Sequence, residues 1–294
     1  QENLWPNETF MQKIISIQSH VAEGYAGNKA AVFPLQRLGI DVTVMNTVQF
    51  SNHTGHAHYL GQTFAAKHID DLFEGLALNN KLNSHQALIT GYLGQLEIGQ
   101  CIIKQLINIR QTHPDFIYCC DTVFGDYATG TYASKEMPAF FRNEILPYAD
   151  IITPNQYELE ILTDQKITDI KSALKACQHA REMGPKIVLL TSFSEPNSSK
   201  IGMFLSTKKE SWLIESPKHK LRPTVGGTGD ISSAIFLAHY LNQMPLFQVL
   251  TQTFNSLYGL IKKTADLNKE ELALIEAQEE IVFPTSNFKA IRIK

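Results

Sequence analysis

Short runs of β-branched and aliphatic residues alternate with longer amphipathic stretches along most of the chain. The short runs predict strands at residues 13–18, 41–46, 87–90, 116–121, 150–153 and 186–191. Helical spacing of apolar residues between them predicts helices at 28–38, 95–110 and 168–182. Strands that alternate with helices of this length need right-handed crossovers. The pattern therefore predicts a doubly wound α/β fold, with a mostly parallel central sheet and helices on both faces.

The last third of the chain departs from this alternation. Residues 201–206 and 211–216 are too close for a crossover helix and predict an antiparallel hairpin. A glycine-rich turn follows, and then the spacing predicts helices at 229–242, 245–264 and 269–282. Because the chain has no internal repeat and no linker rich in Gly, Ser or Pro, we expect residues 11–294 to form a single domain. Residues 1–10 are interpreted as an N-terminal tail, with a non-native origin left open.

Composition and net charge limit the kinds of molecule that this protein is expected to bind. The 294 residues are 44% hydrophobic and 19% charged, which is typical of a globular protein. The net charge of −3, with no long basic run, argues against nucleic acid as a partner. No apolar run reaches the roughly 18 to 20 residues that cross a bilayer. The cysteines lack CxxC spacing and are expected to be free thiols in the cytoplasm: Cys101, Cys119, Cys120 and Cys177.

The most informative local feature is the turn Val225–Asp230, which runs directly into an apolar helix. A glycine turn at a helix N-terminus leaves backbone N–H groups free, and the helix dipole there favours phosphate. Asp230 would repel that phosphate unless it had a task, and a suitable task is to accept a proton from an attacking hydroxyl. The alternative interpretation is a plain helix start, with Asp230 as a cap.

Polar side chains follow the predicted strands, at the sheet edge where ligands bind in open parallel sheets. Ser19, Thr47, His53 and Tyr92 combine hydroxyl groups with rings, which would suit a small, polar, aromatic substrate. Each of these residue types is also common as ordinary structure at a strand end. The histidines of the loop 53–58 lack the partner cysteines or carboxylates that a zinc site requires.

Carboxylates follow two further strands. Asp121 and Asp126 come after the run at 116–121, and Glu158 comes after the run at 150–153. Such a set is expected to converge near a hard cation such as Mg²⁺, which a nucleotide phosphate site requires. The alternative for Asn155 and Glu158 is a capping box, because Asn is a good N-cap and Glu lies three residues later.

Several of these segments together resemble the pyridoxal kinases, a family within the ribokinase-like superfamily. The resemblance spans residues 11–240, and NTVQFSNHT at 46–54 is its most specific element, whereas GTGD at 227–230 alone would indicate only a ribokinase-like protein. The matching segments are QSHV at 18–21, GNKAA at 27–31, NTVQFSNHT at 46–54, TGYLG at 90–94, CDTVFGD at 120–126, TPNQYELE at 153–160 and GTGD at 227–230.

The resemblance implies an ATP-dependent kinase that phosphorylates the 5′-hydroxymethyl group of pyridoxal and of the related vitamers pyridoxine and pyridoxamine. Asp230 would be the catalytic base, and Gly227, Thr228 and Gly229 would form the anion hole for the transferred phosphate. The residues implied to bind the vitamer, besides Asp230, are Ser19, Thr47, Gln49, His53 and Tyr92.

The nucleotide side is implied in the same way. Asp121 and Glu158 would hold Mg²⁺, partly through water. The residues implied to bind ATP, besides the anion hole, are Asp121, Asp126, Thr153, Asn155, Glu158 and Thr191. The family also implies a homodimer and, in many members, a monovalent cation such as K⁺.

Some positions differ from the family's pattern, and two alternative functions remain open. Thr122 stands where the family commonly has proline, Thr191 stands where bacterial members often have lysine, and residues 218–224 match poorly. A kinase of the same fold acting on hydroxymethylpyrimidine or a sugar is one alternative. A non-catalytic vitamin-B6-binding or regulatory protein is another, although an intact Asp230 argues against it because a binder needs no base.

Overall fold

A computed structural model describes residues 11–293 of the chain, so the predicted tail at 1–10 lies outside the described residues. The hydrophobic runs form the parallel centre of one sheet, in the order β9-β8-β5-β4-β1-β2. These strands are β1 (Lys13–Val21), β2 (Asp41–Phe50), β4 (Ala87–Thr90), β5 (Ile117–Cys120), β8 (Ile151–Ile152) and β9 (Ile187–Phe193).

Antiparallel strands extend the sheet at both edges. β3 (Gly61–Thr63) pairs with β2 at one edge. At the other edge β10 (Lys200–Ser206), β11 (Ser211–Pro217) and β12 (Ile291–Ile293) follow β9 in turn. A separate small hairpin consists of β6 (Gly125–Asp126) and β7 (Gly130–Thr131).

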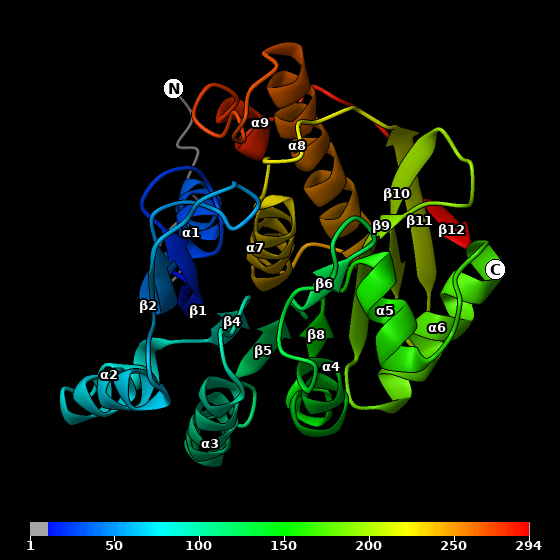
Figure 1. Cartoon of the computed structure of the whole chain (residues 1–294). Coiled ribbons are helices and arrows are strands. Elements are labelled where there is room, and N and C mark those ends of the chain that lie inside the picture. Colours follow the sequence, from blue (N-terminus) through cyan, green and yellow to red (C-terminus); the bar gives the residue numbers. More distant parts are fainter. Residues whose placement is uncertain (1–10, 294) are drawn as a thin grey trace, which may run out of the picture.

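Helices cover both faces of the sheet (Figure 1). One face carries α2 (Ala66–Leu78), α3 (Leu96–Thr112), α4 (Met137–Phe140), α5 (Gln156–Thr163) and α6 (Ile170–Glu182). The other carries α1 (Asn28–Arg37), α7 (Thr228–Leu241), α8 (Leu246–Asp266) and α9 (Glu279–Val282). Short helical turns lie at Leu82–Ser84, Phe141–Ile145 and Leu146–Tyr148. The prediction of a doubly wound α/β fold is confirmed.

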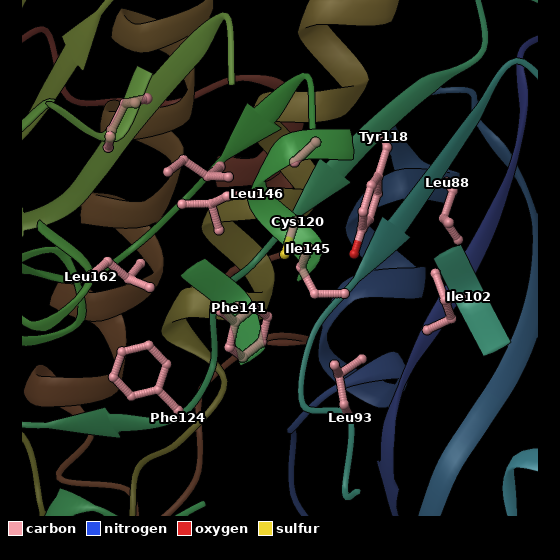
Figure 2. Packing of buried hydrophobic residues seen from close by; sticks show 14 of the residues in the cluster. Leu88, Leu93, Ile102, Tyr118, Cys120, Phe124, Phe141, Ile145, Leu146 and Leu162 are labelled. Atoms are coloured by element: carbon pink, nitrogen blue, oxygen red, sulfur yellow. The ribbon is translucent and has the colours of Figure 1, made fainter. Parts of the chain in front are cut away.

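The sheet separates two apolar core layers. Figure 2 shows Leu88 of β4 and Tyr118 and Cys120 of β5 among the side chains of one layer. Cys119, the neighbour of Cys120, belongs to the other layer, as expected for successive residues of a strand. The predicted free thiols are confirmed for the cysteines, all of which are buried. Between residues 11 and 293, no helix combines the length and apolar character needed to span a membrane.

Two predictions about elements were wrong. The helix expected at 269–282 is confined to α9, because Leu272, Ala273 and Leu274 are all fully buried. Successive residues of an α-helix point about 100° apart, so three in a row cannot all face one core layer. The first two strands are also longer than predicted: β2 continues to Phe50 because it pairs with β3 as well as with β1. The sequence patterns also missed α2 as a helix, and they indicated α5 only through the possible capping box at Asn155 and Glu158.

Candidate active site

The glycine turn forms the N-terminus of α7. Gly227 is the N-cap residue with a φ of 81°, and no side chain caps the helix. A Cβ atom at Gly227 would lie 2.4 Å from the carbonyl oxygen of Tyr25, so the close approach of these two loops needs glycine. The first-turn N–H groups of α7 have no helical partners and point toward a position where an anion can bind.

Asp230 does not cap this helix, so the capping interpretation was wrong. Its Oδ2 atom instead accepts a hydrogen bond of 2.7 Å from the N–H of Gly27, in the loop between β1 and α1. Burial raises the pKa of the Asp230 carboxyl, while the Gly27 N–H and nearby His53 act in the opposite direction. The carboxylate is thus held in a fixed position, next to the free N–H groups of α7.

Gly27 joins Asp230 to the end of β1. Its φ is 55°, and a Cβ atom there would lie 2.1 Å from the carbonyl oxygen and 2.4 Å from the Oγ atom of Ser19. Asn28 fixes the start of α1 by donating from Nδ2 to the Met45 carbonyl oxygen at 2.9 Å and to Asn46 Oδ1 at 2.8 Å. This network brings Ser19 close to Asp230, although they are far apart in the chain.

His53 lies above the glycine turn. Its Nδ1 atom accepts a hydrogen bond of 3.1 Å from the Gly55 N–H, which leaves the proton of a neutral imidazole on Nε2. A Cβ atom at Gly226 would lie 2.9 Å from this Nε2 atom. Burial lowers the pKa of His53, and the carboxylate of Asp230 opposes that shift. The ring can therefore present a donor to a ligand at the turn.

The other predicted vitamer-binding residues lie on β2 and after β4. Thr47 is fully buried, and its hydroxyl donates to the carbonyl oxygen of Tyr92 at 2.7 Å. Tyr92 is half-buried, and burial raises the pKa of its phenol. Gln49 lies beside His20 on the neighbouring strand. Burial lowers the pKa of His20, and a hydrogen bond with the Gln49 side chain opposes that shift. Thr47 and Tyr92 thus form one unit, whereas the Gln49 side chain is associated with His20.

Asp121 and Glu158 form a buried acidic pair. They are only 4% and 2% exposed. Burial raises the pKa of both carboxyls, and the charge of the other carboxylates adds to it: Asp230 acts on Asp121, and Asp121 acts on Glu158. A Cβ atom at Gly229 would lie 3.5 Å from Asp121 Oδ2, so Asp121 reaches the first turn of α7.

Glu158 is held by backbone groups. Its Oε1 atom accepts from the Phe124 N–H at 3.0 Å, and its Oε2 atom accepts from the Asn155 N–H at 3.0 Å. Asn155 completes a capping box at the start of α5, with its Oδ1 atom accepting from the Glu158 N–H at 2.9 Å. The capping-box interpretation is confirmed, and the same arrangement places Glu158 beside Asp121.

The remaining predicted nucleotide residues differ in their settings. Thr153 is buried and shares a hydrogen bond of 2.7 Å with Ser233 of α7. Thr191 donates to the carbonyl oxygen of Pro154 at 3.3 Å. Asp126 points into its own hairpin, where Oδ1 accepts from the N–H groups of residues 128 and 129 at 2.8 and 2.7 Å.

Asp126 therefore does not converge with Asp121 and Glu158 as expected. Over the part of the chain that the structure describes, no cluster of three or more His, Cys, Asp or Glu side chains is arranged to hold a metal ion. Asp126 satisfies the backbone of its tight turn instead, as aspartate commonly does in such loops.

The sequence analysis missed three residues at this site. Ser233 lies one helical turn after Asp230, so its spacing could have indicated it. The role of the Gly27 N–H depends on a contact across 203 positions of the chain, which no local pattern shows. Tyr132 lies in the loop after β7 and is 48% exposed, yet partial desolvation and the charges of the site carboxylates raise the pKa of its phenol.

Comparisons with known proteins agree with this geometry. The profile of the family described as Phosphomethylpyrimidine kinase matches residues 26–274. Pyridoxal kinase PdxY of Deinococcus radiodurans is 39% identical over 97% of this chain and 98% of its own length. The chain belongs to the pyridoxal kinase family. Pyridoxal kinase PdxY of Rubrobacter xylanophilus, at 38% identity over 95% of this chain and 97% of its own length, is a second relative in this family.

Solved pyridoxal kinases have the same fold. A structure described as pyridoxal kinase from Leishmania donovani in complex with ADP and ginkgotoxin has a TM-score of 0.90 and 30% identity, covering 96% of this chain and all of that one. Pyridoxal kinase from Trypanosoma brucei has a TM-score of 0.85 and 30% identity, covering 97% of this chain and all of that one. The predicted ribokinase-like architecture is thus confirmed over nearly the whole chain.

Proposed function

We propose that this protein transfers the γ-phosphoryl group of ATP to the 5′-hydroxymethyl group of pyridoxal, pyridoxine and pyridoxamine. The observation that carries the proposal is the position of Asp230, whose carboxylate is held by the Gly27 N–H at the mouth of an anion site. Relatives over the full length are pyridoxal kinases, and one similar structure is described in complex with ADP and pyridoxamine.

In this proposal Asp230 takes the proton of the vitamer hydroxyl as that oxygen attacks the γ-phosphorus, and the bond from this phosphorus to the bridging β-phosphate oxygen breaks to release ADP. The free N–H groups of Gly227, Thr228 and Gly229 bind the oxygens of the transferred phosphoryl group, where charge is redistributed during transfer. Ser19 lies next to Gly27 and can hydrogen-bond the ring of the acceptor. His53 can donate its Nε2 proton to the acceptor from the side of Gly226. Positioning and electrostatics supply most of the rate enhancement in such a site.

We further propose that Asp121 and Glu158 assist a magnesium ion. Burial and mutual repulsion raise the pKa of both carboxyls, so their ionised forms are costly without a partner, and a bound cation would offset that cost. Glu158 already accepts backbone hydrogen bonds on both oxygens, so its contribution would pass through water. Mg²⁺ commonly keeps several waters and takes one or two carboxylates together with substrate phosphates. Bound there, it would neutralise phosphate charge.

Thr153, Asn155 and Thr191 are proposed to line the nucleotide phosphates and ribose, because they surround the start of α5 beside the acidic pair. Asp126 is proposed to act on the nucleotide only through the hairpin that it stabilises. A homodimer and a K⁺ requirement remain predictions from the resemblance, and a cytoplasmic location remains a prediction from the cysteine spacing. Size measurement in solution and activity assays with and without K⁺ test the first two.

A substrate panel tests the function directly. ADP release is measured with pyridoxal, pyridoxine, pyridoxamine, hydroxymethylpyrimidine and ribose as separate acceptors. We expect the pyridoxal vitamers to give the highest kcat/KM. The second candidate, hydroxymethylpyrimidine, is favoured by the description of the matching family profile. Preference for that alcohol, or no ADP with any of the vitamers, would contradict the proposal.

Asp230→Asn tests the role of the base. The substitution keeps the size of the side chain and removes the proton acceptor, so kcat is expected to fall by at least about 10²-fold. ATP affinity, measured by titration without acceptor, should change little, because the N–H groups of α7 remain. Turnover close to that of the unmodified protein would remove Asp230 from this role.

A further inference from the structure

The chain segment between α8 and α9 carries a carboxylate that the mechanism does not use. Glu271 is only 19% exposed, and its Oε1 atom lies 2.8 Å from Nε2 of His56. Its Oε2 atom accepts a hydrogen bond of 3.4 Å from the N–H of Tyr25. A Cβ atom at Gly24 would lie 2.4 Å from that same oxygen, so the backbone approaches the carboxylate closely. One side chain thus joins three segments that are distant in the sequence.

Both residues that Glu271 contacts lie close in the chain to residues that interact with Asp230. The first arm passes through His56, whose N–H donates to the carbonyl oxygen of His53 at 3.1 Å. The charge of His53 in turn lowers the pKa of Asp230. The second arm passes through Tyr25, two residues before Gly27, whose N–H holds Asp230. The carbonyl oxygen of Tyr25 also faces the position of a Cβ atom at Gly227.

The residues next to Glu271 hold a further segment of the site. Arg222 donates from Nε to Asn268 Oδ1 at 3.0 Å and from Nη1 to Glu270 Oε1 at 2.6 Å. The hydroxyl of Thr224 donates to the carbonyl oxygen of Glu270 at 2.8 Å. These contacts tie the approach to the glycine turn to the same stretch of chain.

We propose that Glu271 is a positioning residue for phosphoryl transfer, which holds the loops of His53 and Gly27 in register around Asp230. The inference rests on the proposed function, since it assigns Glu271 to the acceptor side of that site. A carboxylate suits the task because it can accept from an imidazole and a backbone N–H at once, and charge-assisted hydrogen bonds are stronger than neutral ones. A displacement of about 1 Å at a reacting group can cost about 10²-fold in rate.

The test is a double-mutant cycle in which Glu271→Ala and His56→Ala are made singly and together. We expect Glu271→Ala to lower kcat/KM for pyridoxal by about tenfold or more. The double variant should lose little beyond that, because both residues act through one contact. The affinity for ATP, titrated without acceptor, should change less than about twofold. Glu271→Gln, which keeps an oxygen acceptor, should recover part of the activity.

The matched control is a second ion pair, which joins the end of α1 to the start of α9. Arg37 and Glu279 are joined at 2.9 Å, and the Glu279 side chain is 72% exposed. A cycle with Arg37→Ala and Glu279→Ala should leave kcat/KM for pyridoxal unchanged. Unaltered kinetics in Glu271→Ala, or equal losses of ATP affinity, pyridoxal kcat/KM and thermal stability, would overturn the positioning role.

Hydrogen exchange separates this inference from the proposed function. In the ligand-free protein, Glu271→Ala should speed amide exchange at residues 22–27 and 53–60, and the Glu279→Ala control should not. Unchanged exchange in both loops overturns the inference. If the unmodified protein does not phosphorylate pyridoxal, the proposed function fails whatever the exchange shows. Faster exchange with normal pyridoxal kinetics overturns only the positioning role.

Discussion

Replacing Asp121 by asparagine should stabilise the ligand-free protein while reducing its activity. The carboxyl is 4% exposed, and burial together with the charge of Asp230 raises its pKa from 3.8 to about 8. In the unfolded chain it ionises near its ordinary pKa of about 3.9. Between these values the folded state binds more protons than the unfolded state, so this group lowers stability as pH rises from about 4 to about 8.

The size of the effect follows from this shift. Each pKa unit corresponds to about 1.4 kcal/mol, so the full shift of about four units sets an upper bound of about 6 kcal/mol. Asparagine must still be buried and desolvated, and its NH₂ group replaces one acceptor oxygen near Thr153 and Ser233. We therefore expect a gain of about 1 to 2 kcal/mol at pH 8, equivalent to about 2 to 3 °C in Tm for a chain of this length. The gain should shrink at pH 5.5.

Calorimetry without nucleotide or magnesium, at pH 5.5 and pH 8, measures this difference. Asp126→Asn is the matched control, because its carboxylate accepts hydrogen bonds from its own exposed turn. That variant should be no more stable than the unmodified protein at either pH. ATP turnover of Asp121→Asn should fall by about 10- to 100-fold. A Tm that is lower at both pH values, or a gain that does not grow with pH, would refute the reasoning.

Two further predictions concern the N-terminus of α7. Gly227→Ala should lower kcat by about 10²-fold and also lower Tm, because a Cβ atom there meets the Tyr25 carbonyl at a positive φ. Gly75→Ala on α2 is the control, because a Cβ atom there meets nothing within 4 Å, and it should raise stability by about 0.5 to 1 kcal/mol. Equal changes in kcat and Tm for the two variants would contradict this account. In a pH profile of kcat, activity should be lost as pH falls through the raised pKa of Asp230, which must be ionised to accept a proton. Turnover that stays constant down to pH 4 would argue against Asp230 as the base.

Local patterns were sufficient for the centre of the fold. The parallel strands and most helices were predicted because apolar residues recur at the spacing of strands and helices. The secondary-structure prediction was wrong where tertiary contacts outweigh the local spacing of apolar residues. Residues 269–278 carry a helical pattern, yet the Ala273 N–H donates to Thr264 Oγ1 at 2.9 Å and the neighbouring side chains are all buried. Strand β2 lengthened for a similar reason, since its pairing with β3 could not be anticipated.

For the site, the sequence identified residue types but not all of their partners. It indicated Asp230 and the glycine turn because free N–H groups at a helix start favour anions. It also grouped Asp126 with Asp121 and Glu158, since all of them follow strands. The structure separates Asp126 because the hairpin of β6 and β7 uses its carboxylate to close a turn.

The sequence by itself therefore determined the doubly wound fold, the glycine turn before α7 and the family, because each depends on spacing within short segments. Only the tertiary structure decided what holds Asp230. Its partner Gly27 lies 203 positions away, and Glu271 reaches Tyr25 across 246 positions. Such contacts form when crossovers bring distant loops to one edge of a sheet, and no local periodicity encodes which backbone N–H will face which carboxylate.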